Sequence, residues 1–127
     1  MSYAAGDANG NDLLVFLNGT SLHFYIDGVG TTHSAMDYST LADGEKHSLA
    51  VSWDNTIGYY AIHVDGEFVE SGTGKSTGVT LAGTTGTGAI VFGQEQETIG
   101  GLFESTQVFD GALYDCLLYT SPSPRDS

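Results

Sequence analysis

Short segments that alternate apolar and polar side chains are the feature that most constrains the fold of this chain. In residues 20–26, Leu22, Phe24 and Ile26 alternate with serine, histidine and tyrosine. A period of two is typical of a β-strand with one buried face. The same reasoning predicts strands at 12–17, 20–26, 47–53, 59–64, 67–71, 89–93 and 111–119, with a further short one at 79–81.

Asn-Gly and Asp-Gly pairs follow several of these segments, at Asn18-Gly19, Asp27-Gly28 and Asp65-Gly66. Both residues of such a pair tolerate the positive φ angles of a two-residue hairpin turn. No amphipathic helical period extends beyond about a turn or two. The pattern predicts an all-β chain, an antiparallel β-sandwich of the jelly-roll type.

Length and charge limit the domain count and the partners. The 127 residues are enough for one domain and too few for two. Sixteen acidic residues against three basic ones give a formal net charge of -13, which disfavours nucleic acid as a partner. No apolar run approaches the roughly 20 residues that span a bilayer, so membrane insertion is not expected. Cys116 is the single cysteine, which leaves no internal disulfide.

The segment 93–107, GQEQETIGGLFESTQ, concentrates carboxylates and side-chain amides around a Gly-Gly pair. Ca²⁺ takes about 6–8 oxygen ligands, from carboxylates, amides and backbone carbonyls. Glu95 and Glu97 are two residues apart and project to the same side of an extended chain. Glu104 and Gln107 are three apart, a spacing that one helical turn brings together. These residues predict a calcium site, with a solvated acidic loop as the alternative.

The longer string GQEQETIGGLFESTQVFDGAL resembles the calcium-binding segment of the pentraxins and related laminin G-like modules. Upstream, LADGEKHSLAVSWDNTIGYYAIHVDGEFVESG resembles the core of the same family, and the resemblance covers residues 3–115 in the same order. It implies a concanavalin A-like or laminin G-like jelly roll, an extracellular or cell-surface location and calcium-dependent ligand binding.

The resemblance also implies a set of metal ligands. Glu95 and Glu97 correspond to carboxylates that bridge two calcium ions, and Gln96 to a residue that binds through its backbone carbonyl. Glu104 and Gln107 correspond to ligands of the outer ion, and Asn11 to an amide ligand of the first. Gly10 stands where the family usually has Asp. The expected metal residues are therefore Asn11, Glu95, Gln96, Glu97, Glu104 and Gln107.

The two ends of the chain depart from the family pattern. Residues 1–115 are expected to form the sandwich without its N-terminal strands. Residues 116–127 resemble translated sequencing-adapter read-through and are expected to be a non-native tail. No cysteine lies near Ala50, where the family has one half of a disulfide, which favours a microbial or environmental origin. A sandwich clipped in this way exposes strand edges, so association through these edges is expected.

The functional expectation is a non-enzymatic module that binds a glycan, or an anionic or phosphorylated ligand, through calcium. One alternative is a structural or adhesion module of a larger secreted protein, in which calcium only stabilises the loop. A remote alternative is a sandwich-fold glycosidase that uses Glu95 and Glu97. The histidines show no zinc spacing, and Trp53 is expected in the core. For Tyr25, Tyr38, Tyr59 and Tyr60, packing is the favoured role and stacking on a sugar is the alternative.

Overall fold

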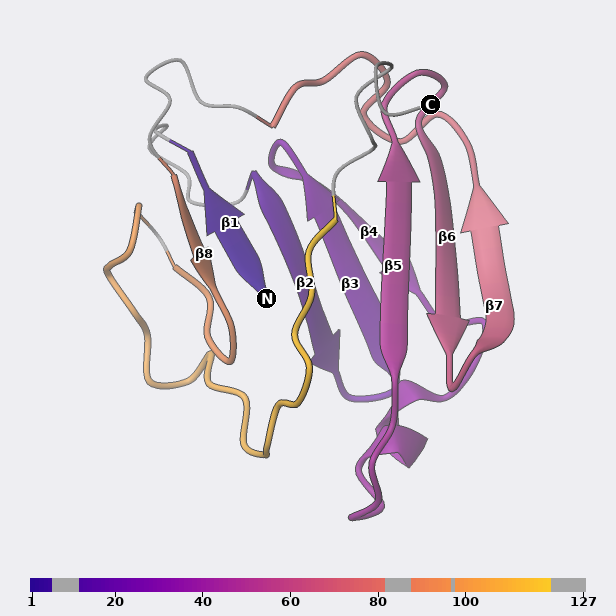
Figure 1. Ribbon diagram of the computed structural model, residues 1–127, viewed down its shortest axis with the longest axis vertical. Coiled ribbons are helices and arrows are strands. Elements are labelled where there is room, and N and C mark those ends of the chain that lie inside the picture. The colour runs from indigo at the N-terminus through magenta and orange to yellow at the C-terminus, as the bar shows by residue number, and fades with distance from the viewer. Residues whose placement is uncertain (6–11, 82–87, 97, 120–127) are drawn as a thin grey trace.

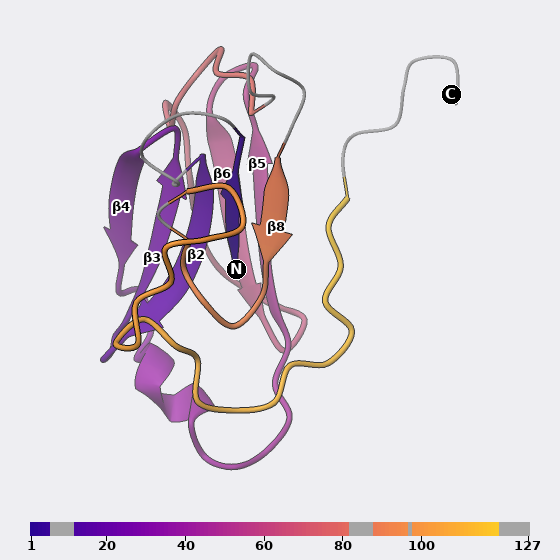
Figure 2. The same ribbon diagram turned by 90° about the vertical axis from the view of Figure 1, so that its left-hand side faces the viewer.

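Two antiparallel sheets packed face to face form the computed structural model, which describes residues 1–5, 12–81, 88–96 and 98–119 (Figures 1 and 2). The larger sheet has the order β4 (Val29–His33), β3 (Ser21–Ile26), β2 (Leu13–Asn18), β1 (Ser2–Ala4) and β8 (Ala89–Val91). The smaller sheet has the order β5 (Leu49–Asp54), β6 (Tyr59–Val64) and β7 (Glu67–Gly72). The short 3-10 helix η1, Tyr38–Leu41, lies between β4 and β5 in the chain. The predicted antiparallel β-sandwich is confirmed.

The hairpin turns follow the predicted glycine pairs with one exception. Asp27 and Gly28 have φ angles of 51° and 72°, and Asp65 and Gly66 have 52° and 80°, as a type I′ turn requires. The first hairpin differs, because Asn18 still pairs with Ser21 and the turn consists of Gly19 and Thr20. Positive φ occurs there only at Gly19, the pattern of a type II′ turn. The prediction of Asn18-Gly19 as the central pair was wrong because β2 continues through Asn18.

The core lies between β3 and β6. Leu22, Phe24 and Ile26 point inward from β3 and are at most 1% exposed. Ile62 and Val64 of β6 pack against them, and Trp53 is partly buried beside this cluster, as expected. Full burial of one such side chain contributes roughly 1.5–3 kcal/mol, so this row of residues dominates the stability of the fold.

Four features of the strand prediction need correction. Residues 111–119 and 79–81 are not strands. The apolar side chains of 113–119 are 47–81% exposed, because this segment has no strand beside it to supply a ladder of hydrogen bonds. In contrast, β1 and β4 were not predicted. In β4, the sequence VGTTH has a weak apolar pattern, and the strand exists because it pairs with β3 along its whole length.

The edge formed by β4 and β7 is cross-linked by polar side chains, and we call it the closed edge. His33 Nδ1 of β4 lies 3.2 Å from Glu70 Oε2 of β7, and Thr31 Oγ1 lies 2.8 Å from His33 Nε2. Lys75 Nζ donates to Val29 O at 3.1 Å and to Thr31 Oγ1 at 2.9 Å. Burial lowers the pKa of Lys75, which is 6% exposed. These contacts join the larger sheet to the smaller one.

The opposite side, formed by β8 and β5, is the open edge. The smaller sheet has three strands against five, and no strand of the described residues faces β1 and β8 (Figure 1). Ile90 of β8 and Leu49 of β5 remain 41% and 39% exposed.

Within the described residues, no helix is long and apolar enough to cross a membrane.

Candidate functional site

The candidate site is the segment 93–109, which we call the acidic loop and which follows β8 directly. Its two ends are joined by an isolated antiparallel bridge between Gln94 and Val108. Phe109 N donates to Gly93 O at 2.8 Å, and Gln94 Nε2 donates to the carbonyl of Glu104 at 3.1 Å. One residue further along this register, Glu95 lies opposite Gln107. The fold therefore brings together two residues that are 12 positions apart in the chain.

The acidic loop covers the outer face of the larger sheet at β1. Ser2, Leu14 and Tyr25 are paired across β1, β2 and β3, so their side chains project from the same face. Ser2 Oγ donates to Gln94 O at 3.1 Å, which places the start of the loop over this face. Leu14 is only 3% exposed although it points away from the core.

Gln96 anchors the loop through its side chain. The residue is fully buried, and its Nε2 donates to Ser2 O at 3.2 Å and to Ala89 O at 2.8 Å. Its Oε1 accepts from Gly100 N at 2.7 Å. Gly100 has a φ of 65°, so the Gly-Gly pair permits this return of the backbone. The metal role expected of Gln96 concerns its backbone carbonyl, which this side-chain anchor holds in place.

Glu104 and Gln107 are brought together by a single turn, in which Gln107 N donates to Glu104 O at 3.1 Å. The side chain of Glu104 is exposed to solvent. Gln107 Oε1 is buried and has no hydrogen-bond partner among the described residues. An unsatisfied buried acceptor costs about 1–3 kcal/mol, and a cation coordinated by this oxygen removes that cost. This part of the site therefore fits a hard metal ion.

Asn11 and Glu97, like Gly10, lie outside the described residues, so their expected roles remain predictions. Glu95 is half-buried and follows the Gln94–Val108 bridge directly. Within residues 1–5, 12–81, 88–96 and 98–119, no three His, Cys, Asp or Glu side chains form a metal-binding group. The described part of the candidate site instead combines carboxylates with amide and backbone oxygens.

An aromatic stack lies on the same outer face, on β2 and β3. The Phe16 ring is stacked on His23 with centroids 4.6 Å apart and an interplanar angle of 6°, and on Tyr25 at 6.1 Å. A side chain at Gly30 would begin 2.3 Å from the Tyr25 ring, so this glycine allows the ring to lie across β4. Sequence reasoning named Tyr25 but missed Phe16 and His23. The hairpin register could have indicated the stack, because it pairs Phe16 with His23.

Comparisons with known proteins place the chain in a family. The family model described as "Pentaxin family" matches residues 1–124. The chain belongs to the pentaxin family. The match also covers most of the segment from 116 onward, so the comparisons do not support an adapter-derived tail.

Individual pentraxin relatives are animal proteins. The chain is 34% identical over 114 residues to rat "Sushi, von Willebrand factor type A, EGF and pentraxin domain-containing protein 1". The aligned residues make up 89% of the chain and 3% of that protein. It is 33% identical over 119 residues to human Pentraxin-4, covering 89% of the chain and 23% of that protein. Human Neuronal pentraxin-2 is 37% identical over 73 residues, 58% of the chain and 16% of that protein.

The chain thus spans less than a quarter of these relatives. The comparisons give no support to a microbial origin, which the missing cysteine near Ala50 had favoured. No solved structure gives a significant match.

Proposed function

We propose that this pentraxin domain is a calcium-dependent binding module whose ligand surface is the outer face of the larger sheet. The observation that carries the proposal is the buried Oε1 of Gln107, which has no partner among the described residues and belongs to the residue opposite Glu95, next to the Gln94–Val108 bridge. Family membership favours binding over catalysis and supports an extracellular location. A glycosidase role has no support beyond the paired glutamates.

In this proposal, Glu95, Glu104, Gln107 and the backbone carbonyl of Gln96 hold calcium, together with Asn11 and Glu97. A bound divalent ion offsets the repulsion among these carboxylates in a chain of net charge -13. The exposed side of the ion then accepts oxygen atoms of a ligand, either a glycan or an anionic or phosphorylated group.

The aromatic stack supplies the second part of the proposed ligand surface. Phe16, His23 and Tyr25 lie on the face that the acidic loop covers further along, so a ligand held by the ion extends over ring surfaces. Aromatic faces suit sugar rings and other flat, partly apolar groups. The acidic loop thus provides charge recognition, and the stack provides shape recognition.

Calorimetric titration with calcium tests the metal part. Gln107→Ala and Glu95→Gln are expected to weaken calcium binding by at least about tenfold, since even supporting residues of metal sites contribute 10–100-fold. Glu67→Gln, an exposed change on β7, is the matched control and is expected to have no effect. Absence of calcium binding by the folded wild-type chain would falsify the proposal.

The ligand part is tested separately, with glycerol phosphate and a glycan array, each with calcium and with chelator. Binding that needs both calcium and Phe16 supports the proposed surface. If calcium raises the melting temperature while both ligand classes fail to bind, the domain is instead a structural or adhesion module. That alternative is consistent with the modular name of the rat relative.

A further inference from the structure

A cleft of about 660 Å³ lies between the end of β2, the segment that contains η1, and residues 109–114, and it touches the acidic loop only at its last residue, Phe109. Its apolar wall includes Leu17, Leu41, Phe109 and Tyr114. The acidic residues Glu45 and Asp110 also line it, and we call this acidic part of the lining the rim. The cleft therefore combines aromatic surface with negative charge.

The protein already places a cation of its own at this cleft. Lys46 Nζ lies 4.8 Å from the centroid of the Tyr114 ring and 3.6 Å from Asp115 Oδ2. Lys46 and Asp115 are 66% and 85% exposed, and an ion pair at that exposure is weak and readily exchanged. The side chains of Glu45 and Asp110 form no ion pair or hydrogen bond within the described part of the chain. The rim therefore holds more negative charge than Lys46 neutralises.

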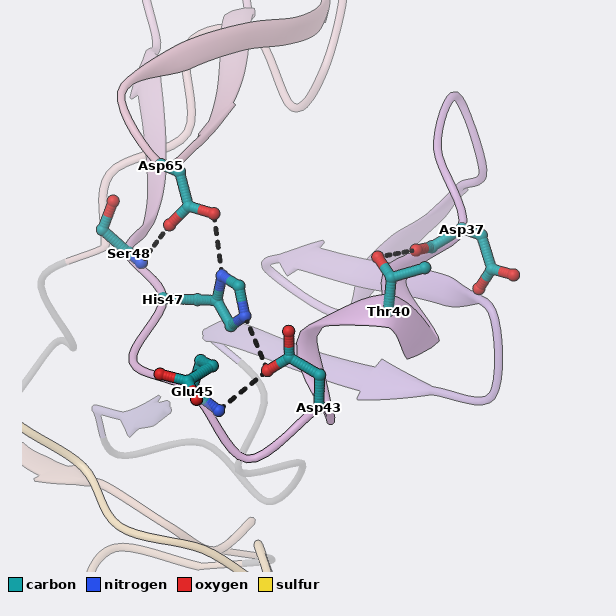
Figure 3. Close-up of polar contacts among 7 residues, drawn as sticks. All are labelled: Asp37, Thr40, Asp43, Glu45, His47, Ser48 and Asp65. Carbon is teal, nitrogen blue, oxygen red and sulfur yellow. Dashed lines mark hydrogen bonds and ion pairs between the residues drawn. The ribbon is translucent and has the colours of Figure 1, made fainter.

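The wall that carries Glu45 and Lys46 is fixed by a cluster of His47, Asp43 and Asp65 (Figure 3). His47 Nδ1 lies 2.8 Å from Asp65 Oδ2, and His47 Nε2 lies 3.0 Å from Asp43 Oδ1. Both ring nitrogens face carboxylates, and the imidazolium form donates to both. Asp43 Oδ1 also accepts from Glu45 N at 2.8 Å. The wall is thus tied to the β6–β7 turn and is preorganised for a ligand.

We propose that this cleft binds a lysine side chain of a partner polypeptide, which displaces Lys46 from the Tyr114 ring. The aliphatic stem lies on Leu17 and Leu41, and the ammonium group meets Tyr114 and the carboxylates of Glu45 and Asp110. An ammonium group over an aromatic face gains electrostatic attraction, and Lys46 shows that this ring accepts one. The site shares only Phe109 with the acidic loop, uses none of the expected metal residues and needs no calcium.

The test is an NMR titration of the ¹⁵N-labelled chain with N-acetyl-lysine methylamide, in chelator and again in calcium. Shifts confined to the residues that line the cleft, Leu17, Leu41, 44–46 and 109–114, with an affinity unaffected by calcium, are expected. N-acetyl-norleucine methylamide, the neutral analogue, should cause no such shifts. Equal binding of n-butylamine would overturn the assignment to a polypeptide, because the backbone groups would then contribute nothing.

Substitutions separate the cleft from general attraction to an acidic protein. Tyr114→Leu is expected to weaken binding about threefold and Lys46→Met to strengthen it by a similar factor. Tyr59→Leu is the matched control, because it removes the ring of another exposed tyrosine, on β6, and should leave binding unchanged. Asp110→Asn should weaken binding more than Glu67→Gln, although both remove one charge. Equal effects within each pair would overturn the proposal.

Discussion

The two sides of this sandwich are held together in opposite ways. At the closed edge, His33 to Glu70 connects strands of different sheets, and Lys75, in the segment after β7, bonds to Val29 of β4; each interaction is directional. At the open edge, β8 and β5 share no such interaction within the described residues, and Ile90 and Leu49 stay about two-fifths exposed. Polar cross-links complete one side, whereas the other side leaves apolar surface in water.

The difference shows that the candidate metal loop belongs to the less supported side. The acidic loop follows β8, and the residues that anchor it are Ser2, Gln94 and Gln96. These anchors are hydrogen bonds to the larger sheet and within the loop, and none of them reaches the smaller sheet. We therefore expect the open edge to depend on bound calcium and the closed edge to be independent of it.

The largest expected effect comes from the covered core. Phe24→Ala is expected to lower the free energy of unfolding by about 3–5 kcal/mol, because it removes a ring buried between the sheets. Ile90→Ala, at the open edge, should cost about 1 kcal/mol or less, since that side chain is already partly hydrated. Urea unfolding measures both. Similar losses for the two variants would show that the open edge is covered in solution.

Calcium provides the next largest effect. At a concentration 100 times its dissociation constant, a ligand that binds only the folded state adds about 2.7 kcal/mol to stability. Hydrogen exchange should show that the added protection appears in residues 93–109 and in β1 and β8. Protection spread equally over β4 and β7 would contradict the expected difference between the edges.

A single cross-link at the closed edge should have a smaller effect. Glu70→Ala leaves the buried His33 without its carboxylate partner and is expected to cost about 1–3 kcal/mol. Glu67→Ala, three residues earlier on β7 and exposed, should change stability by less than about 0.5 kcal/mol. Chemical denaturation with and without calcium compares them. If the loss in unfolding free energy caused by Glu70→Ala depended on calcium, the two edges would be coupled, which contradicts the expected independence.

The smallest effect concerns pH at the surface cluster of Figure 3. Hydrogen bonds to Asp65 and Asp43 raise the pKa of His47, whereas hydrogen bonds from Ser48 and Glu45, together with His47, lower the pKa of Asp65 and Asp43. The His47 contribution is complete below its ordinary pKa of about 6.5 and is lost as pH rises through the raised value. The aspartate contributions are complete above about 3.8 and are lost as pH falls through the lowered values.

Melting temperatures across pH should therefore reveal a shallow maximum between about 4 and 6.5, and His47→Gln should flatten its alkaline side. An alkaline decline that is unchanged in His47→Gln would remove this cluster as its cause.

Local pattern was enough to predict the strands that carry the core. Leu22, Phe24 and Ile26 alternate strictly, and Asp27-Gly28 allows only a tight turn, so β3 and its turn follow from adjacent residues. The same local logic failed for 111–119, where apolar residues alternate loosely but have no strand beside them. In β4, pairing with β3 decides the structure and the sequence itself contributes little.

Part of the candidate site could also be predicted. The turn that brings Glu104 and Gln107 together follows from their spacing. The anchor role of the Gln96 side chain could not be predicted, because it depends on the carbonyl groups of Ser2 and Ala89. Ser2 is distant in sequence, and only the pairing of β1 with β8 brings the two carbonyl groups to the same place. The aromatic stack required the hairpin register and the missing side chain at Gly30.

The three hydrogen bonds of Gln96 have a consequence for protein engineering. One side chain fixes the base of the acidic loop to two strands, and the Gln94–Val108 bridge closes it. The residues between these two fixed points can therefore be exchanged as a cassette. A library that varies 101–106 and keeps Gln94, Gln96, Gly100 and Val108 would redesign ion and ligand preference on an unchanged scaffold.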